Sequence, residues 1–422
     1  MGLSEKIYGL LGRKLSHSWS VPIHKALGCG GYRLIELEPD ELGKFLSQEN
    51  IGGLNVTIPY KRDVMAFCDV IDEGAQSIGS VNTLVRKADG KLYGYNTDIH
   101  GFLYMARRSG VSFDGKKVVV LGSGGASLTV QAAARREGAR EVVAVSRTGA
   151  DNYGNLERHG DAEILVNATP VGMWPDVNGQ PVDLRRLPGL EAVMDLICNP
   201  SRTELLLQAE KMGLRRAGGL SMLVNQAVAA EERFFDRPIP DSETERILEQ
   251  LQRDQVNLVL VGMPGSGKTT VGMELARMTG RPFVDLDDEV VRMTGKSIPE
   301  IFSRHGEQAF RALERKALSE VCGRTGQVIA TGGGAILRKD NRADMRRTGR
   351  LYFLRRELDQ LAVIGRPLSV KGTMKEMYRF RLPIYTEVSD IAVDNDTPPA
   401  ETAQRIWGDF YKNAGNDYLI RL

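Results

Sequence analysis

Two short apolar runs, each followed at once by a glycine-rich turn, constrain the fold of this 422-residue chain more than any other feature. The first run is Val118–Leu121, before Gly122, and the second is Leu258–Val261, before Gly262. Apolar runs that alternate with helical patterns along the chain are typical of buried strands in parallel sheets. Glycines at such turns let the backbone approach a phosphate at the start of the next helix. The sequence therefore predicts an α/β protein with two nucleotide sites of different type.

Length and composition narrow the class of protein. At roughly 150 residues per domain, the chain has room for two or three domains. The net charge of +2 is too balanced to favour a nucleic-acid or membrane partner. The four cysteines form no C-x-x-C pair, so we expect neither a zinc site nor a disulfide framework. No stretch reaches the roughly 20 apolar residues of a membrane span. We expect a cytoplasmic protein that acts on small molecules, and the sequence leaves its oligomeric state open.

The boundary between the two halves is predicted near residues 250–255. Residues 241–252 have the pattern of a polar amphipathic helix, capped by Asp241 or Ser242, and a strand is expected to begin near Val256. The predicted limits are 1–251 for the N-terminal part, with lobes 1–100 plus 218–251 and 101–217, and 256–422 for the C-terminal part.

The second glycine-rich turn carries the stronger phosphate signal. Residues 262–269 read Gly-Met-Pro-Gly-Ser-Gly-Lys-Thr and fit G-x-x-x-x-G-K-[ST] without a mismatch, between a strand and a helical pattern. Lys268 can reach the outer phosphates of a nucleotide, and Thr269 can place its hydroxyl on Mg²⁺. The motif indicates a nucleoside triphosphate but does not identify the acceptor.

Later segments bear on the acceptor. Asp285–Asp287 offers two carboxylates for a metal-bound water and a substrate hydroxyl, or only a helix cap. The guanidinium of Arg311 suits a carboxylate, although an ordinary helix-surface arginine would look the same. Gly333 lies in a run of three glycines that permits close backbone approach to a small ligand. Arg366 and Arg381 could close over transferring phosphates.

Taken together, residues 256 to about 412 resemble shikimate kinase, with the motifs in that family's order. The resemblance implies a P-loop, NMP-kinase-like three-layer α/β domain that uses ATP and Mg²⁺. It implies that ATP is held by Gly262, Gly265, Ser266, Gly267, Lys268, Thr269 and Thr270. It implies a metal site at Thr269 and Asp285, shikimate-binding residues Arg311, Gly333 and Arg381, and catalytic groups Asp287, Lys268 and Arg366. Val363 and Ile364 fall near where the family often has an arginine stacked on adenine.

The first glycine-rich turn, Gly122–Ser127, is similar to a dinucleotide fingerprint with Ser127 at the third glycine position. An ordinary strand–helix turn would also fit this pattern. The next strand ends in Ser146–Thr148, where a NAD site usually has an acidic residue for the ribose hydroxyl. Arg147 instead matches a 2′-phosphate and favours NADP, although an exposed loop arginine is the alternative.

The catalytic candidates lie upstream of this turn. Asn55–Lys61 has the pattern of a strand that ends in Pro, with Lys61 at a helix start, where the positive helix end would suit a general acid/base. Read alone, Lys61 would be a solvated lysine. Asp98 follows a hairpin turned at Ala88–Gly90 and would by default be a helix N-cap. Beside Lys61, it could orient the ammonium group.

As a set, these segments resemble shikimate dehydrogenase over residues 5 to about 250. The matching segments are His17–Ser20, Asn55–Lys61, Ser80–Thr83, Gly94–Asp98, Asn167–Met173 and Gly219–Gln226. The resemblance implies a two-lobed fold with a Rossmann NADP lobe and Lys61 and Asp98 as the catalytic pair. It implies that the substrate is bound by Ser18, Ser20, Thr57, Asn82, Asn96 and Gln226. It implies that NADP is lined by Gly122, Gly124, Gly125, Ala126, Ser146, Arg147 and Thr148, with Thr169, Gly219 and Met222 near the nicotinamide. Cys198 stands where the family commonly has a substrate-contacting Tyr.

The combined expectation is a bifunctional enzyme of chorismate and aromatic amino-acid biosynthesis. It would reduce 3-dehydroshikimate to shikimate with NADPH and then phosphorylate shikimate with ATP. Three alternatives stay open: a kinase fused to a non-catalytic sensor module, a dehydrogenase half that prefers quinate and NAD, and a P-loop half that only switches on nucleotide binding.

Overall fold

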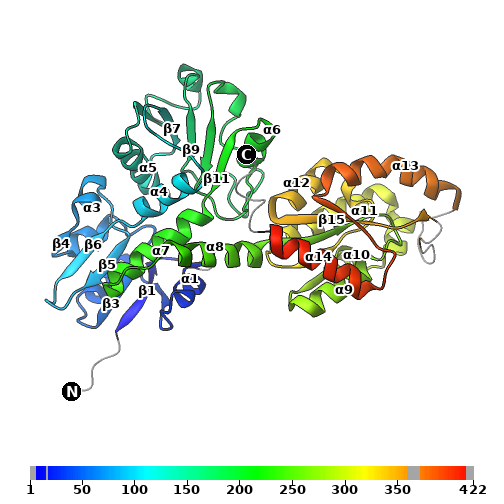
Figure 1. The fold of residues 1–422 in the computed structure, drawn as a ribbon, viewed down its shortest axis with the longest axis horizontal. Helices are drawn as coiled ribbons and strands as arrows, with labels where there is room; N and C mark the ends of the chain where they lie inside the picture. The colour runs from blue at the N-terminus through cyan, green and yellow to red at the C-terminus, as the bar shows by residue number, and fades with distance from the viewer. Residues whose placement is uncertain (1–5, 16–17, 359–360, 362–370, 415–422) are drawn as a thin grey trace. The chain divides into compact units, whose positions relative to one another are not determined.

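The computed structural model describes residues 6–15, 18–358, 361 and 371–414 (Figure 1). These residues divide between two compact units that meet in the sequence at Glu249 and Gln250. Helix α8 (Asp241–Gln255) carries the chain through this point and begins at one of the two residues named as its cap. The finer limits of domains and lobes stay a prediction.

The N-terminal unit begins with a mixed six-stranded sheet in the order β2-β1-β3-β5-β6-β4. Strands β5 and β6 pair antiparallel, so the hairpin predicted around residues 88–90 is confirmed. The sheet packs on helix α7, whose Phe234 lies so close to Gly53 that a Cβ there would come within 2.2 Å of the ring. Only glycine lets the helix approach this strand. The strands are β1 (Ile7–Gly12), β2 (Arg33–Glu36), β3 (Ile51–Val56), β4 (Val70–Ile71), β5 (Thr83–Arg86) and β6 (Leu92–Tyr95).

The second sheet of this unit is parallel, in the order β11-β10-β9-β7-β8. Alternate residues of β7 enter different cores, because side chains along a strand point to opposite faces. Val118 and Val120 pack with residues of α4 and α5, whereas Val119 and Leu121 pack with residues of α6. The sheet is therefore covered on both faces, and its strand order reverses between β7 and β9. Its strands are β7 (Lys117–Leu121), β8 (Glu141–Val145), β9 (Ile164–Asn167), β10 (Ala192–Asp195) and β11 (Arg215–Gly218).

The C-terminal unit contains one parallel sheet in the order β13-β14-β12-β15-β16. Val259 and Val261 of β12 pack with residues of α10, α11 and α12, whereas Leu258 and Leu260 pack with residues of α9 and α14. Two helical layers therefore enclose the sheet, as the predicted three-layer domain requires. The strands are β12 (Asn257–Val261), β13 (Phe283–Asp285), β14 (Val328–Ala330), β15 (Gly349–Arg355) and β16 (Ile391–Asp394).

Helices complete both units. Those of the N-terminal unit are α1 (Ser20–Ala26), α2 (Leu42–Leu46), α3 (Glu73–Ile78), α4 (Asp98–Arg108), α5 (Gly125–Arg136), α6 (Glu204–Lys211) and α7 (Leu220–Phe235), with 3₁₀ turns η1 (Pro39–Glu41), η2 (Asp63–Phe67), η3 (Leu156–His159) and η4 (Leu184–Arg186). Those of the C-terminal unit are α9 (Lys268–Thr279), α10 (Leu286–Thr294), α11 (Ile298–Cys322), α12 (Lys339–Thr348), α13 (Lys371–Val388), α14 (Pro399–Asn413) and the turn η5 (Ala335–Leu337). Within the described residues, none of the helices combines the length and apolar character needed to cross a membrane.

Candidate active sites

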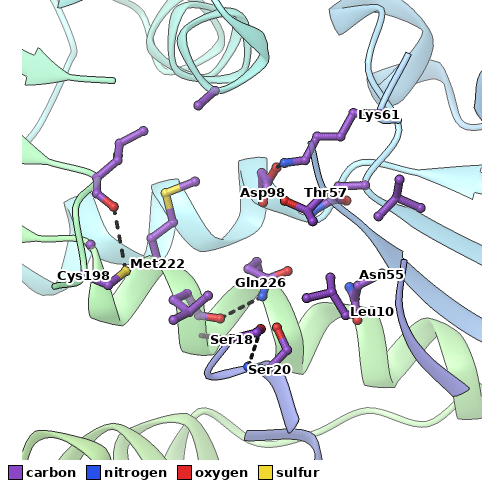
Figure 2. Close-up of a pocket in the computed structure, with 16 residues that line it drawn as sticks. Leu10, Ser18, Ser20, Asn55, Thr57, Lys61, Asp98, Cys198, Met222 and Gln226 are labelled. Carbon is purple, nitrogen blue, oxygen red and sulfur yellow. Dashed lines mark hydrogen bonds and ion pairs between the residues drawn. The ribbon is translucent and has the colours of Figure 1, made fainter. Parts of the chain in front are cut away.

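A cavity of about 300 Å³ opens in the N-terminal unit between its two sheets (Figure 2). Segments far apart in the sequence supply its walls. Of the predicted site residues, those that line it are Ser18, Ser20, Thr57, Lys61, Asn82, Asp98, Ala126, Gly219, Met222 and Gln226. Six further lining residues were not predicted as site residues: Leu10, Asn55, Val56, Leu196, Cys198 and Leu223. Asn55 had a signal, since it opens the motif that ends in Lys61, and Cys198 had been noted only as a departure from the family.

Of the predicted substrate-binding residues, one is not part of this lining, and the predicted NADP residues outside it are Gly122, Gly124, Gly125, Ser146, Arg147, Thr148 and Thr169. Asn96 is buried, and its side-chain amide donates to the carbonyl of Ser80 at 2.9 Å. Asn82 does line the cavity and accepts a hydrogen bond from the backbone N–H of Thr97 at 2.7 Å. A contact between Asn96 and the substrate therefore stays a prediction, and the position of Asn96 in the structure does not itself indicate one.

Lys61 and Asp98 face one another across the cavity wall. The ammonium nitrogen lies 2.6 Å from Asp98 Oδ2, and the two side chains are 23% and 13% exposed. Figure 2 shows the pair on one side of the pocket and Cys198 and Met222 on another. A lysine held by a carboxylate and still open to the cavity can donate a proton to a bound ligand.

Two local expectations about this pair are wrong. Lys61 does not begin a helix, because it lies in a turn that precedes the short 3₁₀ segment η2. Its ammonium is therefore placed by Asp98 and not by a helix end. Asp98 is not an N-cap, since Thr97 takes that position and Asp98 is the first residue of α4.

The first glycine-rich turn lies where the parallel sheet reverses its strand order, the usual ligand crevice of such sheets. Gly122 has φ +109°, and a Cβ there would come within 3.0 Å of the Ala168 carbonyl. At Gly124 a Cβ would meet no atom within 4 Å, so the turn leaves space beside the start of α5. Ser127 is buried, and its hydroxyl donates to the Gly122 carbonyl at 2.7 Å. A serine at the third glycine position is thus accommodated, and the cradle fits a dinucleotide.

The end of β8 supplies the other part of this crevice. Arg147 and Thr148 are exposed, and the hydroxyl of Ser146 accepts the backbone N–H of Gly149 at 3.0 Å. Asp151, a few residues after this strand end, pairs with His159 at 2.9 Å. Arg147 thus offers an exposed guanidinium at this strand end, a position that suits a 2′-phosphate.

A buried carboxylate, Asp195, organises the loops on the other side of the crevice. It accepts from the hydroxyl of Thr203 at 2.6 Å, the amide of Asn167 at 3.1 Å and the backbone N–H of Ile197 at 3.1 Å. Asn167 in turn accepts from the backbone N–H of Thr169 at 3.0 Å. Thr169, predicted near the nicotinamide, is therefore held by a two-step chain from Asp195. Burial raises the pKa of Asp195 to about 6, although all three donors oppose the shift.

We expect this carboxylate to make the stability of the N-terminal unit depend on pH. The folded pKa of about 6 exceeds the ordinary value of 3.8, so the folded state holds the proton more tightly. At low pH this difference adds about 3 kcal/mol to the free energy of unfolding, and the contribution is lost as the pH rises from about 4 to about 6. Asp195→Asn keeps the shape without the charge and should flatten this slope. The free energy of unfolding is measured at each pH from hydrogen exchange in β9 and β10 at increasing urea concentration. The same dependence of this free energy on pH in the wild type and in Asp195→Asn would contradict the assignment.

A second cavity, of about 280 Å³, lies in the C-terminal unit beside the P-loop. The predicted residues that line it are Gly265, Lys268, Thr269, Asp285, Asp287, Arg311, Gly333 and Arg381. Residues that line it without having been predicted are Pro264, Ile298, Pro299, Phe302, Phe310, Glu314, Thr331, Gly332, Gly334 and Met377. Gly262, Ser266, Gly267 and Thr270 belong to the P-loop and the start of α9 without lining this cavity. Arg366 lies outside the described residues, as do Val363 and Ile364.

The P-loop residues fit a nucleotide with its metal ion. Thr269 donates its hydroxyl to Asp285 Oδ2 at 2.7 Å, which places a hydroxyl and a carboxylate side by side for Mg²⁺. The other oxygen of Asp285 accepts the backbone N–H of Asp287 at 3.0 Å, so Asp285 is also the N-cap of α10. Lys268 donates to the carbonyls of Gly262 at 3.0 Å and Met263 at 2.9 Å.

The rest of this cavity combines two guanidinium groups with two carboxylates, the half-buried Asp287 and the buried Glu314. Arg311 donates to Glu314 at 2.8 Å, and Arg381 donates to the Gly333 carbonyl at 3.0 Å. Burial raises the pKa of Asp287 and of Glu314, and the positive charge of Arg311 opposes both shifts. A pocket with two arginines and a carboxylate of raised pKa suits a small hydroxylated acid. Glu314 was missed as a site residue, although its position three residues after Arg311 was a signal.

Fold and pockets together define an enzyme with a dinucleotide-linked oxidoreductase unit and a P-loop kinase unit. The family described as shikimate dehydrogenase substrate binding domain matches residues 10–84, and the family described as shikimate kinase matches residues 264–409. The NADP(+) shikimate dehydrogenase of Clostridium perfringens is 36% identical over 268 residues, which cover 58% of this chain and 98% of the relative. That of Methanopyrus kandleri is 38% identical over 281 residues, with 58% and 96% covered.

Solved structures agree with this relationship. A chorismate mutase/shikimate 5-dehydrogenase fusion protein from Clostridium acetobutylicum is 35% identical, with TM-score 0.57 and coverage of 59% of this chain and 98% of that chain. A shikimate 5-dehydrogenase from Thermus thermophilus, in complex with NADP(H) and shikimate, is 31% identical, with TM-score 0.52 and coverage of 57% and 97%. The chain belongs to the shikimate dehydrogenase family and carries a shikimate kinase domain after it. The predicted resemblance and fold class are confirmed, and both parts are enzymes of aromatic amino-acid biosynthesis.

Proposed function

We propose that the N-terminal unit reduces 3-dehydroshikimate to shikimate with NADPH, and that the C-terminal unit phosphorylates the 3-hydroxyl of shikimate with ATP and Mg²⁺. The observation that carries this proposal is the Lys61–Asp98 pair at 2.6 Å, in a cavity that Ala126 of the dinucleotide turn also lines. A proton donor and a place for a hydride donor thus share one pocket.

In the reductase unit, NADPH supplies the hydride when bound. Lys61 donates a proton to the ketone oxygen as negative charge develops there, and Asp98 keeps the ammonium aimed at that oxygen. The hydroxyls of Ser18 and Ser20 and the amide of Gln226 line the cavity and can bind the carboxylate and ring hydroxyls. The proton on the product oxygen comes from Lys61, which solvent then reprotonates.

In the kinase unit, ATP supplies the phosphoryl group when bound. Asp287 faces the cavity and can accept a hydrogen bond from the attacking hydroxyl, while Arg311 and Arg381 hold the carboxylate of shikimate. Lys268 stabilises charge on the transferring group, and Thr269 with Asp285 would hold the metal ion. Catalysis here is mainly positioning and charge stabilisation.

A single reaction mixture tests both halves. The purified chain with 3-dehydroshikimate, NADPH, ATP and Mg²⁺ should oxidise one NADPH for each shikimate 3-phosphate formed. Phosphorylation of added shikimate without NADPH consumption would favour the sensor alternative. Nucleotide binding without shikimate 3-phosphate would favour the switch alternative. Oxidation of quinate with NAD⁺, compared with oxidation of shikimate with NADP⁺, tests the alternative of a dehydrogenase half that prefers quinate and NAD.

Arg147→Ala should shift the cofactor preference of the reductase. Loss of the guanidinium removes a charge-assisted hydrogen bond to the 2′-phosphate, worth about 2 kcal/mol, so KM for NADPH should rise about thirtyfold. KM for NADH should not change, because NADH has no 2′-phosphate. Steady-state kinetics with both cofactors measures this, with Arg158→Ala, another exposed arginine of the same unit, as the control. Equal changes for NADPH and NADH would show that Arg147 does not read the phosphate.

A further inference from the structure

An imidazole–carboxylate pair lies fully buried in the substrate lobe. His24 of α1 and Glu231 of α7 expose no side-chain surface, and Nδ1 lies 2.5 Å from Oε1. Neither residue lines the cavity, and His24 Nε2 and Glu231 Oε2 have no hydrogen-bond partner within the described part of the chain. Such buried pairs add little stability compared with apolar side chains of similar volume. Its neighbours indicate a positioning role instead.

The nearest neighbour is the ring of Tyr32. The His24 and Tyr32 rings stack with their centroids 3.8 Å apart and their planes 8° apart. Tyr32 is itself buried, and burial with the nearby Glu231 charge raises the pKa of its hydroxyl well above the ordinary value. The phenol therefore keeps its proton at every pH at which the enzyme works, and it is a fixed hydrogen-bond donor.

Asn55 of β3 receives this hydrogen bond and also lines the substrate cavity. The Tyr32 hydroxyl donates to Asn55 Oδ1 at 2.8 Å. An asparagine amide has one oxygen and one NH₂ group, so fixing the oxygen fixes the nitrogen as well. The amide nitrogen also donates one N–H to Thr83 Oγ1 at a long 3.4 Å. These two contacts keep the amide from rotating its oxygen toward the ligand.

We propose that Tyr32, held in place by His24 and Glu231, is a positioning residue that orients Asn55 so that its N–H donates to an oxygen of the bound cyclohexene carboxylate. The inference rests on the proposed function and deepens it, because it assigns a donor polarity to one point of the substrate site. Ligands with an oxygen acceptor at that point are bound, and ligands with only a donor there are rejected.

Tyr32→Phe tests the proposal with the loss of a single hydroxyl. Freed from Tyr32, the Asn55 amide can turn, so one hydrogen bond to the substrate is weakened. We expect KM for 3-dehydroshikimate and Kd for shikimate, measured by calorimetry, to rise about tenfold, with kcat within twofold of the wild type. Asn55→Asp keeps an acceptor for Tyr32 but removes the N–H, and it should weaken shikimate binding at least as much.

Tyr104→Phe is the matched control. Tyr104 is also buried and also donates its hydroxyl to a side chain, but its acceptor, Glu245, does not line the cavity, whereas Asn55 does. It should lower Tm without changing KM, as a merely structural tyrosine would. Wild-type KM and Kd in Tyr32→Phe, or wild-type binding in Asn55→Asp, would overturn the inference. Failure of the wild-type chain to oxidise NADPH would instead overturn the proposed function. The Kd for shikimate of the wild type and of Tyr32→Phe, measured by calorimetry, would still test the role of Tyr32.

Discussion

Lys61→Ala should lower the rate of NADPH-linked reduction by about a thousandfold and leave phosphorylation of shikimate at its wild-type rate. The ammonium at 2.6 Å from Asp98 is the proton donor of the proposed reaction, and alanine leaves no replacement at that position. The ketone would then have to take its proton from water. Absorbance of NADPH with 3-dehydroshikimate measures the first activity, and shikimate 3-phosphate formed from shikimate and ATP measures the second.

Lys91→Ala is the control for Lys61→Ala, because Lys91 is an exposed lysine of the same lobe beside strand β6. It should change neither activity. The Lys61 variant also leaves Asp98 without its cation, so its Tm is measured alongside. A folded Lys61→Ala protein that still reduces 3-dehydroshikimate at more than a tenth of the wild-type rate would show that Lys61 is not the acid.

Lys268→Met should lower the rate of shikimate phosphorylation to about a thousandth of the wild-type rate and leave the reduction of 3-dehydroshikimate unchanged. Methionine fills much of the space of the lysine stem, so the buried position stays packed while the charge is lost. Without this charge, the phosphoryl group in transfer loses a main source of stabilisation. Coupled formation of ADP, measured with shikimate present, reports the kinase rate.

The matched control is Lys316→Met, an exposed lysine on α11 of the same unit. It should leave kinase activity intact. Binding of ATP to the Lys268 variant separates affinity from chemistry: weak binding with a near-normal kcat at saturation would contradict a role for Lys268 in the transfer step.

Motifs of fixed local spacing were predictable from the sequence. Residues 262–269 identify a phosphate loop because the glycines, the lysine and the threonine must stand at set intervals for one phosphate to contact them all. The turn at Gly122 was predicted with its departure at Ser127, but the hydrogen bond from Ser127 to the Gly122 carbonyl was not. The parallel sheets were predictable because their buried strands are continuous apolar runs that alternate with helical patterns. Such runs are apolar throughout because successive residues pack into the cores on opposite faces of the sheet.

Features that depend on tertiary contacts could not be predicted. His24 and Glu231 are 207 residues apart, and no local pattern links them. Lys61 was expected at a helix start because a proline precedes it, yet the chain continues as a turn and the partner carboxylate comes from α4. Asn96 matched a motif but turns its amide to the Ser80 carbonyl. Local sequence places such residues on an element, whereas the direction of their side chains depends on the packed neighbours.

The contacts of Lys268 with the carbonyls of Gly262 and Met263 have a consequence for ligand discrimination. A molecule that enters the loop must compete with two neutral acceptors already placed around the ammonium. Phosphate oxygens can do so because their negative charge adds Coulomb attraction to the ammonium, which a neutral carbonyl oxygen does not offer. A nucleoside without phosphates has no anionic oxygen to replace the two carbonyls, so Lys268 keeps its hydrogen bonds to Gly262 and Met263. The P-loop thereby acts as a filter that admits ligands by their anionic charge before the shape of the base matters.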